Sequence, residues 1–326
     1  MSLTAQPPVS TTPSSASPTV LGRPISFWTR FALIWLMAIT VSGAAVRLTG
    51  SGLGCTDWPT CSVNEELDAP AFHSTIEFGN RVISGLAIIP VVAAWVLARR
   101  SRPDLRATIV GLVLGFIGQV VLGMLVTRTE LDPRVVLGHF LLSIVLIFLG
   151  VVLDYRARHA ADERTTLNAK QRSQRTHAYI VTGLATVVIV MGTLVTGSGP
   201  HTGSEASGEP IARLGFDIWE ITRAHSIAAW ILVLSIVAGL WRARPGANTS
   251  ATTALAYTWF LRIGVLAVAQ GAVGYVQFAT GVPVELVGAH IAGSVLLWTA
   301  ASWYALVATF PPTERPISVP EPTSTR

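Results

Sequence analysis

The chain of 326 residues is 51% hydrophobic and only 13% charged, with a formal net charge of +5. Soluble domains carry about 25% charged residues, so this composition excludes a soluble enzyme, a disordered chain and a collagen-like fibre and predicts a membrane protein. Two cysteines exclude a scaffold of several disulfides and a metal site of four thiolates, but they allow one bridge.

Eight apolar stretches meet the length of about 20 residues that a transmembrane helix requires. The sequence therefore predicts an all-α integral membrane protein with eight transmembrane helices. In chain order the predicted spans are Phe27–Val46, Ser74–Ala98, Ala107–Thr127, Arg134–Asp154, Ala178–Thr196, Trp219–Trp241, Ala256–Ala279 and Glu285–Thr309. We expect residues 1–26 and 311–326, which are rich in Ser, Thr and Pro, to be disordered cytoplasmic tails.

The basic residues are distributed unevenly over the connections between these spans. Basic residues collect on the cytoplasmic side of membrane proteins. Twelve lie after the second, fourth and sixth spans, and only four lie in or beside the other connections. We therefore expect both termini in the cytoplasm, residues 48–73 and 197–218 outside, and a location in the cell (plasma) membrane. This asymmetry explains the basic charge without a nucleic-acid partner.

The two halves of the chain share short motifs at nearly constant offsets. The segment Leu48–Gly52 recurs as Val195–Gly199, offset by 147 residues, and His139 is matched by His290, offset by 151. Gln119 and Gly123 are matched by Gln270 and Gly274 at the same offset of 151. We predict two duplicated four-helix bundles, each with an interior that can hold a cofactor. They comprise residues 27–154 and 178–310, joined by a cytoplasmic linker of residues 155–177.

Three of the seven histidines fall inside predicted spans, each five or six residues from the outer end. A rise of 1.5 Å per residue places His139, His225 and His290 about 8–9 Å below the outer surface. A single intramembrane histidine can serve only in a helix–helix hydrogen bond, but such residues are more often functional. His225 and His290 lie at one depth on different helices, which suits two axial ligands of a heme. Zinc would require further ligands.

The first half lacks one of these histidines and has a carboxylate that the second half lacks. Asn80 stands 145 residues before His225, and Glu77 lies one turn before Asn80, where the second half has Thr222. Glu77 either forms an ion pair with Arg81 at i+4 or lies beside a bound macrocycle. The asymmetry between the halves favours the second interpretation.

The first outer loop contains both cysteines, Cys55 and Cys61, around a Trp-Pro turn. On an oxidising side this pair can close a disulfide, which is either a structural staple or a redox-active pair. Four arginines near the outer boundary suit pairing with propionates, although snorkelling to the surface explains each of them equally well. They are Arg47, Arg81, Arg128 and Arg223.

The segment from Arg47 to Cys61, followed by Glu77 and Arg81, resembles the heme A synthase family, and the resemblance extends over residues 27–310. It implies an oxidoreductase that converts the methyl group of heme O to the formyl group of heme A for aa3-type cytochrome oxidases. The implied partners are the substrate heme O, a heme O synthase and cytochrome oxidase assembly proteins.

The resemblance also implies roles for individual residues. It makes His225 and His290 the ligands of a resident heme b, places His139 and Asn80 at the substrate heme, and makes Glu77 the catalytic carboxylate. Cys55 and Cys61 match the family's outer-loop cysteine pair. Asn80 departs from the family pattern, because many members have a second histidine there and an asparagine is a poor iron ligand. His73, seven residues earlier, would approach that position only if the helix start bends.

Two rival functions remain at this point. A di-heme membrane cytochrome that only carries electrons or heme explains the three histidines, but not Glu77 or the cysteine pair. A transporter is disfavoured because we expect no broken helices and no paired charges at the middle of the membrane.

Overall fold

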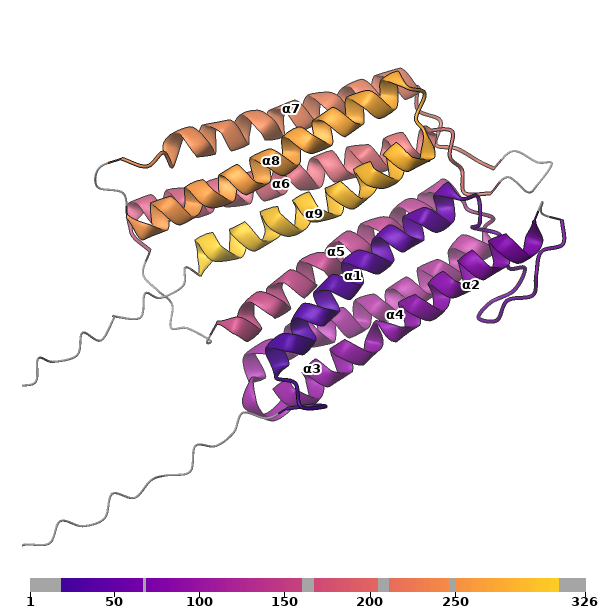
Figure 1. Cartoon of the computed structure of the whole chain (residues 1–326), viewed down its shortest axis with the longest axis horizontal. Coiled ribbons are helices and arrows are strands. Elements are labelled where there is room, and N and C mark those ends of the chain that lie inside the picture. The colour runs from indigo at the N-terminus through magenta and orange to yellow at the C-terminus, as the bar shows by residue number, and fades with distance from the viewer. Residues whose placement is uncertain (1–18, 67–68, 160–166, 205–210, 247–249, 311–326) are drawn as a thin grey trace, which may run out of the picture.

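The computed structural model describes residues 19–66, 69–159, 167–204, 211–246 and 250–310. Within these ranges the chain is helical, and only isolated bridges occur in the loops. Of the predicted tails, residues 1–18 and 311–326 lie outside the described residues. The prediction of a tail to residue 26 was wrong for its last part, because Val20 and Arg23 form a bridge and α1 already begins at Ile25. The helices, labelled in Figure 1, are α1 (Ile25–Leu48), α2 (Pro70–Leu86), α3 (Ile88–Ser101), the short η1 (Pro103–Leu105), α4 (Arg106–Arg128), α5 (Pro133–Arg158), α6 (Ala169–Ser198), α7 (Ile218–Arg242), α8 (Ala251–Ala279) and α9 (Val284–Thr309).

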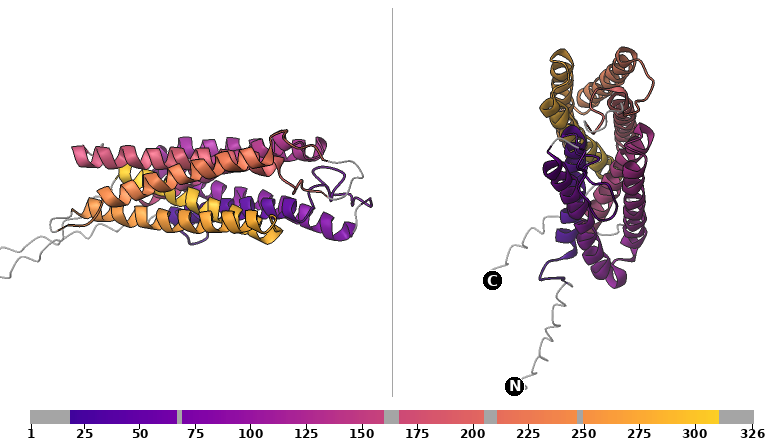
Figure 2. Two further views of the ribbon diagram at one scale, coloured as in Figure 1. Left: turned by 90° about the horizontal axis from the view of Figure 1, so that it is seen from above. Right: turned by 90° about the vertical axis from the view of Figure 1, so that its right-hand side faces the viewer.

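Eight helical segments are long and apolar enough to cross a membrane, which confirms the eight predicted spans. Helices α2 and α3 together form one of these segments, and η1 continues directly into α4. The spanning segments run side by side along the long axis of the molecule (Figures 1 and 2). Large apolar side chains such as Leu114, Leu234 and Val265 remain exposed on their outer faces, as lipid contact requires.

Helix α6 begins nine residues earlier than the predicted span. Asn168 and Gln171 form a reciprocal capping box, in which each side chain accepts a hydrogen bond of 2.9 Å from the other residue's backbone N–H. This arrangement satisfies backbone donors at a helix start. Because α5 also continues to Arg158, the predicted linker of residues 155–177 is helical at both ends.

The second span crosses as one segment, but its helical hydrogen-bond pattern is interrupted at one residue, Ala87. Helix α2 ends at Leu86 and α3 begins at Ile88, with the Ala87 N–H donating to the carbonyl of Ser84. Pro90 causes the break, because it has no N–H to offer Leu86 and its ring crowds that carbonyl. The break lies ten residues, about 15 Å of helix, from Glu77.

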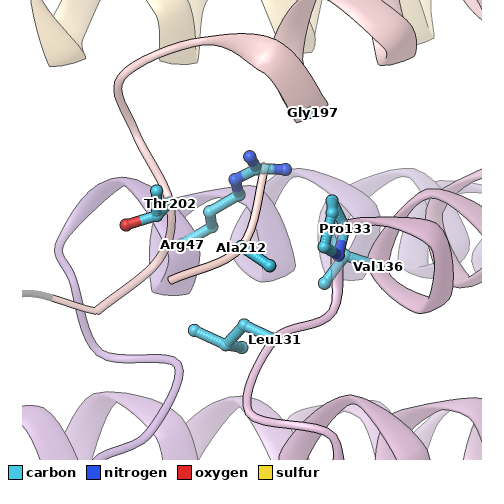
Figure 3. A pocket seen from close by; sticks show the side chains of 7 residues that line it. All are labelled: Arg47, Leu131, Pro133, Val136, Gly197, Thr202 and Ala212. Carbon is cyan, nitrogen blue, oxygen red and sulfur yellow. The ribbon is translucent and has the colours of Figure 1, made fainter. Parts of the chain in front are cut away.

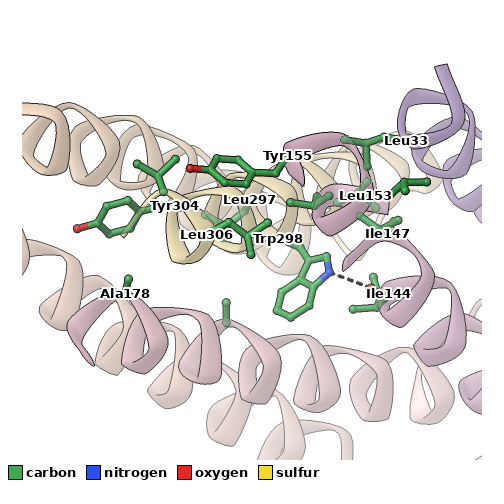
Figure 4. Close-up of a cluster of buried hydrophobic side chains, with 14 of the residues drawn as sticks. Leu33, Ile144, Ile147, Leu153, Tyr155, Ala178, Leu297, Trp298, Tyr304 and Leu306 are labelled. Atoms are coloured by element: carbon green, nitrogen blue, oxygen red, sulfur yellow. Dashed lines mark hydrogen bonds between the residues drawn. The ribbon is translucent and has the colours of Figure 1, made fainter. Parts of the chain in front are cut away.

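The helices pack as two groups, with α1 to α5 in one and α6 to α9 in the other. The groups meet where α9 contacts α1 and α5, and where α5 contacts α6. A shared apolar core fills this junction, and the buried Trp298 indole donates a hydrogen bond of 2.9 Å to the carbonyl of Ile144 (Figure 4). The start of α1 and the end of α9 lie at the same end of the molecule. A common origin of the two groups stays a prediction.

A fully buried carboxylate fixes α1 against α5 at that end. Asp154 accepts hydrogen bonds from Thr29 at 3.0 Å, from Arg30 at 2.6 Å and from Arg158 at 3.0 Å. A buried charge is tolerated only when it is paired and hydrogen-bonded in this way. Asp154 is therefore a structural anchor at the end of the bundle opposite the cysteine loop.

Candidate functional site

Glu77 lies buried on α2, at the outer end of the first group of helices. Its Oε1 accepts a hydrogen bond of 2.5 Å from Arg81, so the predicted ion pair is present. Its Oε2 accepts a hydrogen bond of 2.9 Å from the backbone N–H of Cys55 in the outer loop. Both carboxylate oxygens are thus held, one by a charge on the same helix and one by the loop.

Arg81 also binds the loop directly. Its Nη1 donates to the carbonyl oxygens of Asp57, at 2.8 Å, and Thr60, at 2.6 Å. Both carbonyls lie between the two cysteines. A guanidinium is planar and rigid, so Arg81 fixes the distance between the carboxylate and the cysteine loop.

The predicted disulfide between Cys55 and Cys61 is present, with the two Cα atoms 4.8 Å apart. Both sulfur atoms lie 3.9 Å from the carbonyl oxygen of Ser74, near the start of α2. A Cβ on Gly54 would lie 2.5 Å from the backbone of His73, so only glycine allows the loop to approach this closely. The disulfide loop therefore rests on the start of the helix that carries Glu77.

Asn80 and His73 are both occupied by short hydrogen bonds. Asn80 accepts from the Ser42 hydroxyl on α1 at 2.8 Å, and His73 Nδ1 lies 2.9 Å from the Ser51 hydroxyl. The His73 side chain thus contacts the outer loop, and its hydrogen bond is to Ser51 rather than to Asn80. The role of Asn80 at a substrate heme stays a prediction.

His139 on α5 is the histidine of the first group. Its Nδ1 is buried, and no hydrogen-bond partner for it occurs among the described residues. Gln119 on α4 donates to the His139 carbonyl at 3.1 Å and to the Ser143 hydroxyl at 2.8 Å, which fixes the two helices together. An uncommitted buried imidazole nitrogen is costly unless it serves a ligand, and it fits the predicted contact with a heme.

In the second group, His225 on α7 and His290 on α9 face each other as a histidine pair. Their ring centroids are 6.3 Å apart, with an angle of 76° between the ring planes. Two imidazoles that bind one metal from opposite sides, each through a bond of about 2 Å, have ring centres about 6 Å apart. The observed separation fits a metal between the rings.

The hydrogen bonds of the histidine pair agree with this fit. His225 Nδ1 lies 3.1 Å from the carbonyl of Val188, which leaves Nε2 for a ligand. Metal-binding histidines commonly donate the other ring N–H to a backbone carbonyl. His290 Nδ1 is buried without a partner in the described part of the chain. Those same residues contain no cluster of three or more His, Cys, Asp or Glu side chains, as a zinc site would need.

Glycines on neighbouring helices make room for all three imidazoles, and the sequence analysis missed this role. A Cβ would lie 3.1 Å from His225 at Gly192, 3.2 Å from His290 at Gly274 and 3.5 Å from His139 at Gly123. Gly123 and Gly274 appeared in the sequence only as part of the repeat. Gly192 itself is not part of a repeated motif, and only its contact with His225 reveals its role.

The two helix groups are joined at the outer end by Arg47 of α1. Its guanidinium donates to the carbonyls of Thr196 and His201, each at 2.9 Å, and the Gly52 N–H donates to the Gly203 carbonyl at 2.8 Å. A water-sized cavity of about 10 Å³ lies beside Arg47, and Figure 3 shows its lining. The hydrogen bonds of Arg47 therefore go to the second group, while Arg223 pairs with Glu220 at 2.6 Å. Pairing of arginines with propionates stays a prediction.

Comparisons with known proteins agree with the resemblance noted from the sequence. A heme A synthase of Exiguobacterium sp. is 25% identical over 236 residues, which cover 69% of this chain and 75% of that protein. A heme A synthase of Bacillus mycoides is 28% identical over 167 residues, or 49% of this chain and 53% of that protein. A protoheme IX farnesyltransferase of Thermus thermophilus is 41% identical over 83 residues, which span 23% of this chain and only 14% of that protein.

The family comparison covers a larger part of the chain than any of these three pairwise matches. The sequence pattern of the COX15-CtaA family, described as cytochrome oxidase assembly proteins, matches residues 26–302. This range includes all eight spanning segments except the first residue of α1 and the last residues of α9, and it includes the Glu77 site and the histidine pair. The chain is a multi-pass membrane protein that belongs to the COX15-CtaA family of cytochrome oxidase assembly proteins.

Proposed function

We propose that this protein is a heme A synthase, which oxidises the methyl group of heme O to the formyl group of heme A. Family membership and the relatives named heme A synthase support this proposal. The observation that carries it is the buried Glu77, held by Arg81 and the Cys55 amide in the half that has only one intramembrane histidine. An electron carrier would not need such a carboxylate.

The second half, residues 178–310, holds a resident heme b between His225 and His290. The 6.3 Å separation of the rings and the Val188 hydrogen bond support this assignment. When bound, this heme supplies one-electron redox chemistry. The protein itself fixes the ring of His225 through the Val188 carbonyl. Gly192 makes room for the imidazole of His225, and Gly274 makes room for that of His290.

The first half, residues 27–154, binds the substrate heme O beside His139 and Asn80. Glu77 is the catalytic carboxylate of this half, and it acts on the methyl group either by accepting its proton or by stabilising positive charge that develops there. Arg81 and the Cys55 amide keep the carboxylate in one orientation for this task. Residues 155–177 connect the halves on the cytoplasmic side.

The orientation in the membrane follows from the distribution of arginines. We place both termini in the cytoplasm and the disulfide loop on the oxidising side of the cell (plasma) membrane, because basic residues concentrate at the end opposite that loop. The short match to a protoheme IX farnesyltransferase supports a heme O synthase as a partner that supplies the substrate. Cytochrome oxidase assembly proteins would receive the product.

Heme analysis of the full-length protein tests this proposal. The chain is expressed in a host that makes heme O but no heme A, and the total heme is extracted and separated by chromatography. We expect heme A to appear only when the chain is present. A protein that binds two hemes but yields no heme A would instead be a di-heme cytochrome.

A further inference from the structure

A second cavity lies between α6 and α7, away from the histidine pair, and its accessible surface is mostly apolar with a few polar groups. Its volume is about 380 Å³, within the range of about 300–1,000 Å³ that is typical of ligand sites. Ser235, on its α7 wall, is ten residues or about 15 Å of helix from His225. Five of its seven lining residues carry hydroxyl, imidazole or guanidinium groups. The lining residues are Ser173, Thr176, His177, Ile180, Ser235, Ala238 and Arg242.

Hydrogen bonds between the two helices fix these polar groups. Arg242 Nη2 donates to the Ser173 hydroxyl at 2.6 Å, and His177 Nε2 lies 2.9 Å from the Ser235 carbonyl and 3.2 Å from its hydroxyl. The His177 imidazole also packs against the Phe260 ring, and the two ring centres are 5.0 Å apart. These hydrogen bonds hold the exposed Arg242 and the half-buried His177 in place across the gap between α6 and α7.

The cavity carries positive charge that no carboxylate of the described chain neutralises. The described carboxylates at this end of the molecule are Asp104 and Asp154, which pair with arginines other than Arg242. Arg242 forms no ion pair among the described residues. A guanidinium flanked by hydroxyl donors is the arrangement that binds phosphate oxygens.

The position of the cavity relative to the membrane surface indicates what kind of ligand can reach it. Trp219 and Trp241, at the two ends of α7, are 67% and 65% exposed, and they are separated by 22 residues, or about 33 Å. This length matches a hydrocarbon layer of about 30 Å with a tryptophan at each interface. Arg242 thus lies at the level of the lipid headgroups. Ile180, which is half exposed, opens the cavity toward the lipid.

In the described part of the first half, the positions that match His177 and Arg242 do not repeat this pair of polar groups. At the repeat offsets of 147 and 145 residues, His177 and Arg242 correspond to Arg30 and Leu97. Arg30 is occupied by its ion pair with Asp154, and Leu97 is buried. The combination of His177 and Arg242 facing one cavity is therefore not repeated at the matching positions of the first half.

We propose that this cavity binds the phosphate headgroup of one anionic glycerophospholipid, with Arg242 and Ser173 as its main contacts. The acyl chains lie along the lipid-facing side at Ile180 and Ala238. The bound lipid joins α6 to α7, the helix that carries His225. The proposal is independent of the reaction, because it rests only on the cavity, its charge and its depth.

Native mass spectrometry of the full-length protein in detergent tests this site. The delipidated protein is titrated with phosphatidylglycerol, with phosphatidylcholine and, separately, with inorganic phosphate. We expect one phosphatidylglycerol molecule to bind preferentially. Arg242→Gln should lower the affinity for phosphatidylglycerol about tenfold and Ser173→Ala about threefold, because hydrogen bonds to the charged phosphate are lost. Ser173→Ala removes one hydroxyl and keeps the test valid if Arg242→Gln fails to fold.

Arg244→Gln is the matched control. Arg244 is two residues away and lies over the Trp241 ring at 5.3 Å, but it does not line the cavity. Its loss should change the affinity less than about twofold. An equal loss of affinity in Arg244→Gln would overturn the proposal, because general charge would then explain binding. Equal binding of phosphatidylcholine, or binding of inorganic phosphate as tight as that of the lipid, would also overturn it.

Discussion

The Glu77 carboxylate is held by Arg81 and by the Cys55 amide, so the effect of removing its charge on heme A formation can be predicted. Glu77→Gln keeps the shape of the side chain and one acceptor for the Cys55 amide, but it removes the charge that faces Arg81. If the carboxylate takes a proton or stabilises positive charge, heme A formation should fall about 100-fold or more. We expect heme O or a hydroxylated intermediate to accumulate in extracts, measured by chromatography.

A matched substitution separates this effect from loss of charge in general. Glu220→Gln removes the carboxylate of the exposed Glu220–Arg223 pair at the outer end of α7. This variant should produce heme A at the wild-type level. Wild-type production by Glu77→Gln would remove Glu77 from the mechanism.

The histidine pair makes a separate prediction at the same scale. His225→Ala or His290→Ala removes one of two imidazoles whose centres are 6.3 Å apart, so the low-spin heme b signal should disappear from the optical spectrum while the protein still inserts into the membrane. His159→Ala, at the far end of α5, is the control and should keep the signal. A full low-spin signal in both variants of the pair would reject the assignment.

At the scale of elements, the contact between the disulfide loop and α2 depends on Gly54. Gly54→Ala would put a Cβ 2.5 Å from the His73 backbone, which has no free rotation to relieve the clash. The loop must move away, and the Cys55 N–H then loses Glu77. We expect heme A formation to fall about tenfold or more, because a misplaced catalytic group is costly, while the heme b spectrum is unchanged.

Gly79→Ala is the control for this prediction, because nothing lies within 4 Å of a Cβ at that position on α2. It should keep normal heme A formation. If Gly54→Ala behaves in the same way, the loop does not position the carboxylate.

The elements differ in how far they could be predicted from the sequence. Hydropathy located all eight spans, because the apolar length of a span is a local property. The early start of α6 and the break at Ala87 also have local causes, in the Asn168–Gln171 capping box and in Pro90, and both signals were present in the sequence. The hydropathy pattern did not locate these helix ends, because hydropathy reports burial in lipid and not backbone hydrogen bonding.

The Glu77 site was predictable only in part. The spacing of Glu77 and Arg81 on one helix face predicted their ion pair. The hydrogen bond from Cys55 to Glu77 joins residues 22 positions apart, and it exists only because Gly54 lets two backbone segments touch. No periodicity or propensity encodes such a contact. The same is true of Gly192, which was identified only by its distance from His225.

On the scale of the whole molecule, Arg47 is the main polar link between the helix groups at the outer end. Arg47→Met keeps much of the side-chain volume but leaves the carbonyls of Thr196 and His201 without this donor. Each buried acceptor that loses its partner costs about 1–3 kcal/mol. We expect the thermal unfolding midpoint of the purified protein to fall by several degrees.

Arg134→Met provides the comparison for Arg47. Arg134 also lies near the outer end, but its side chain is 80% exposed and pairs only with Asp132 beside it. Exposed pairs of this kind contribute little, so its midpoint should stay within about one degree of wild type. Equal shifts in the two variants would mean that Arg47 does not connect the groups.

The junction between the groups has a consequence for the covalent continuity of the chain. The groups are held by the α9 contacts with α1 and α5, by Trp298 on Ile144, and by Arg47 and Gly52 at the outer end. None of these contacts involves the peptide connection between Arg158 and Asn168. Two separately translated fragments, cut within that connection, should therefore find each other in the membrane, co-purify through a tag on either one, and restore heme A formation that neither fragment supports alone.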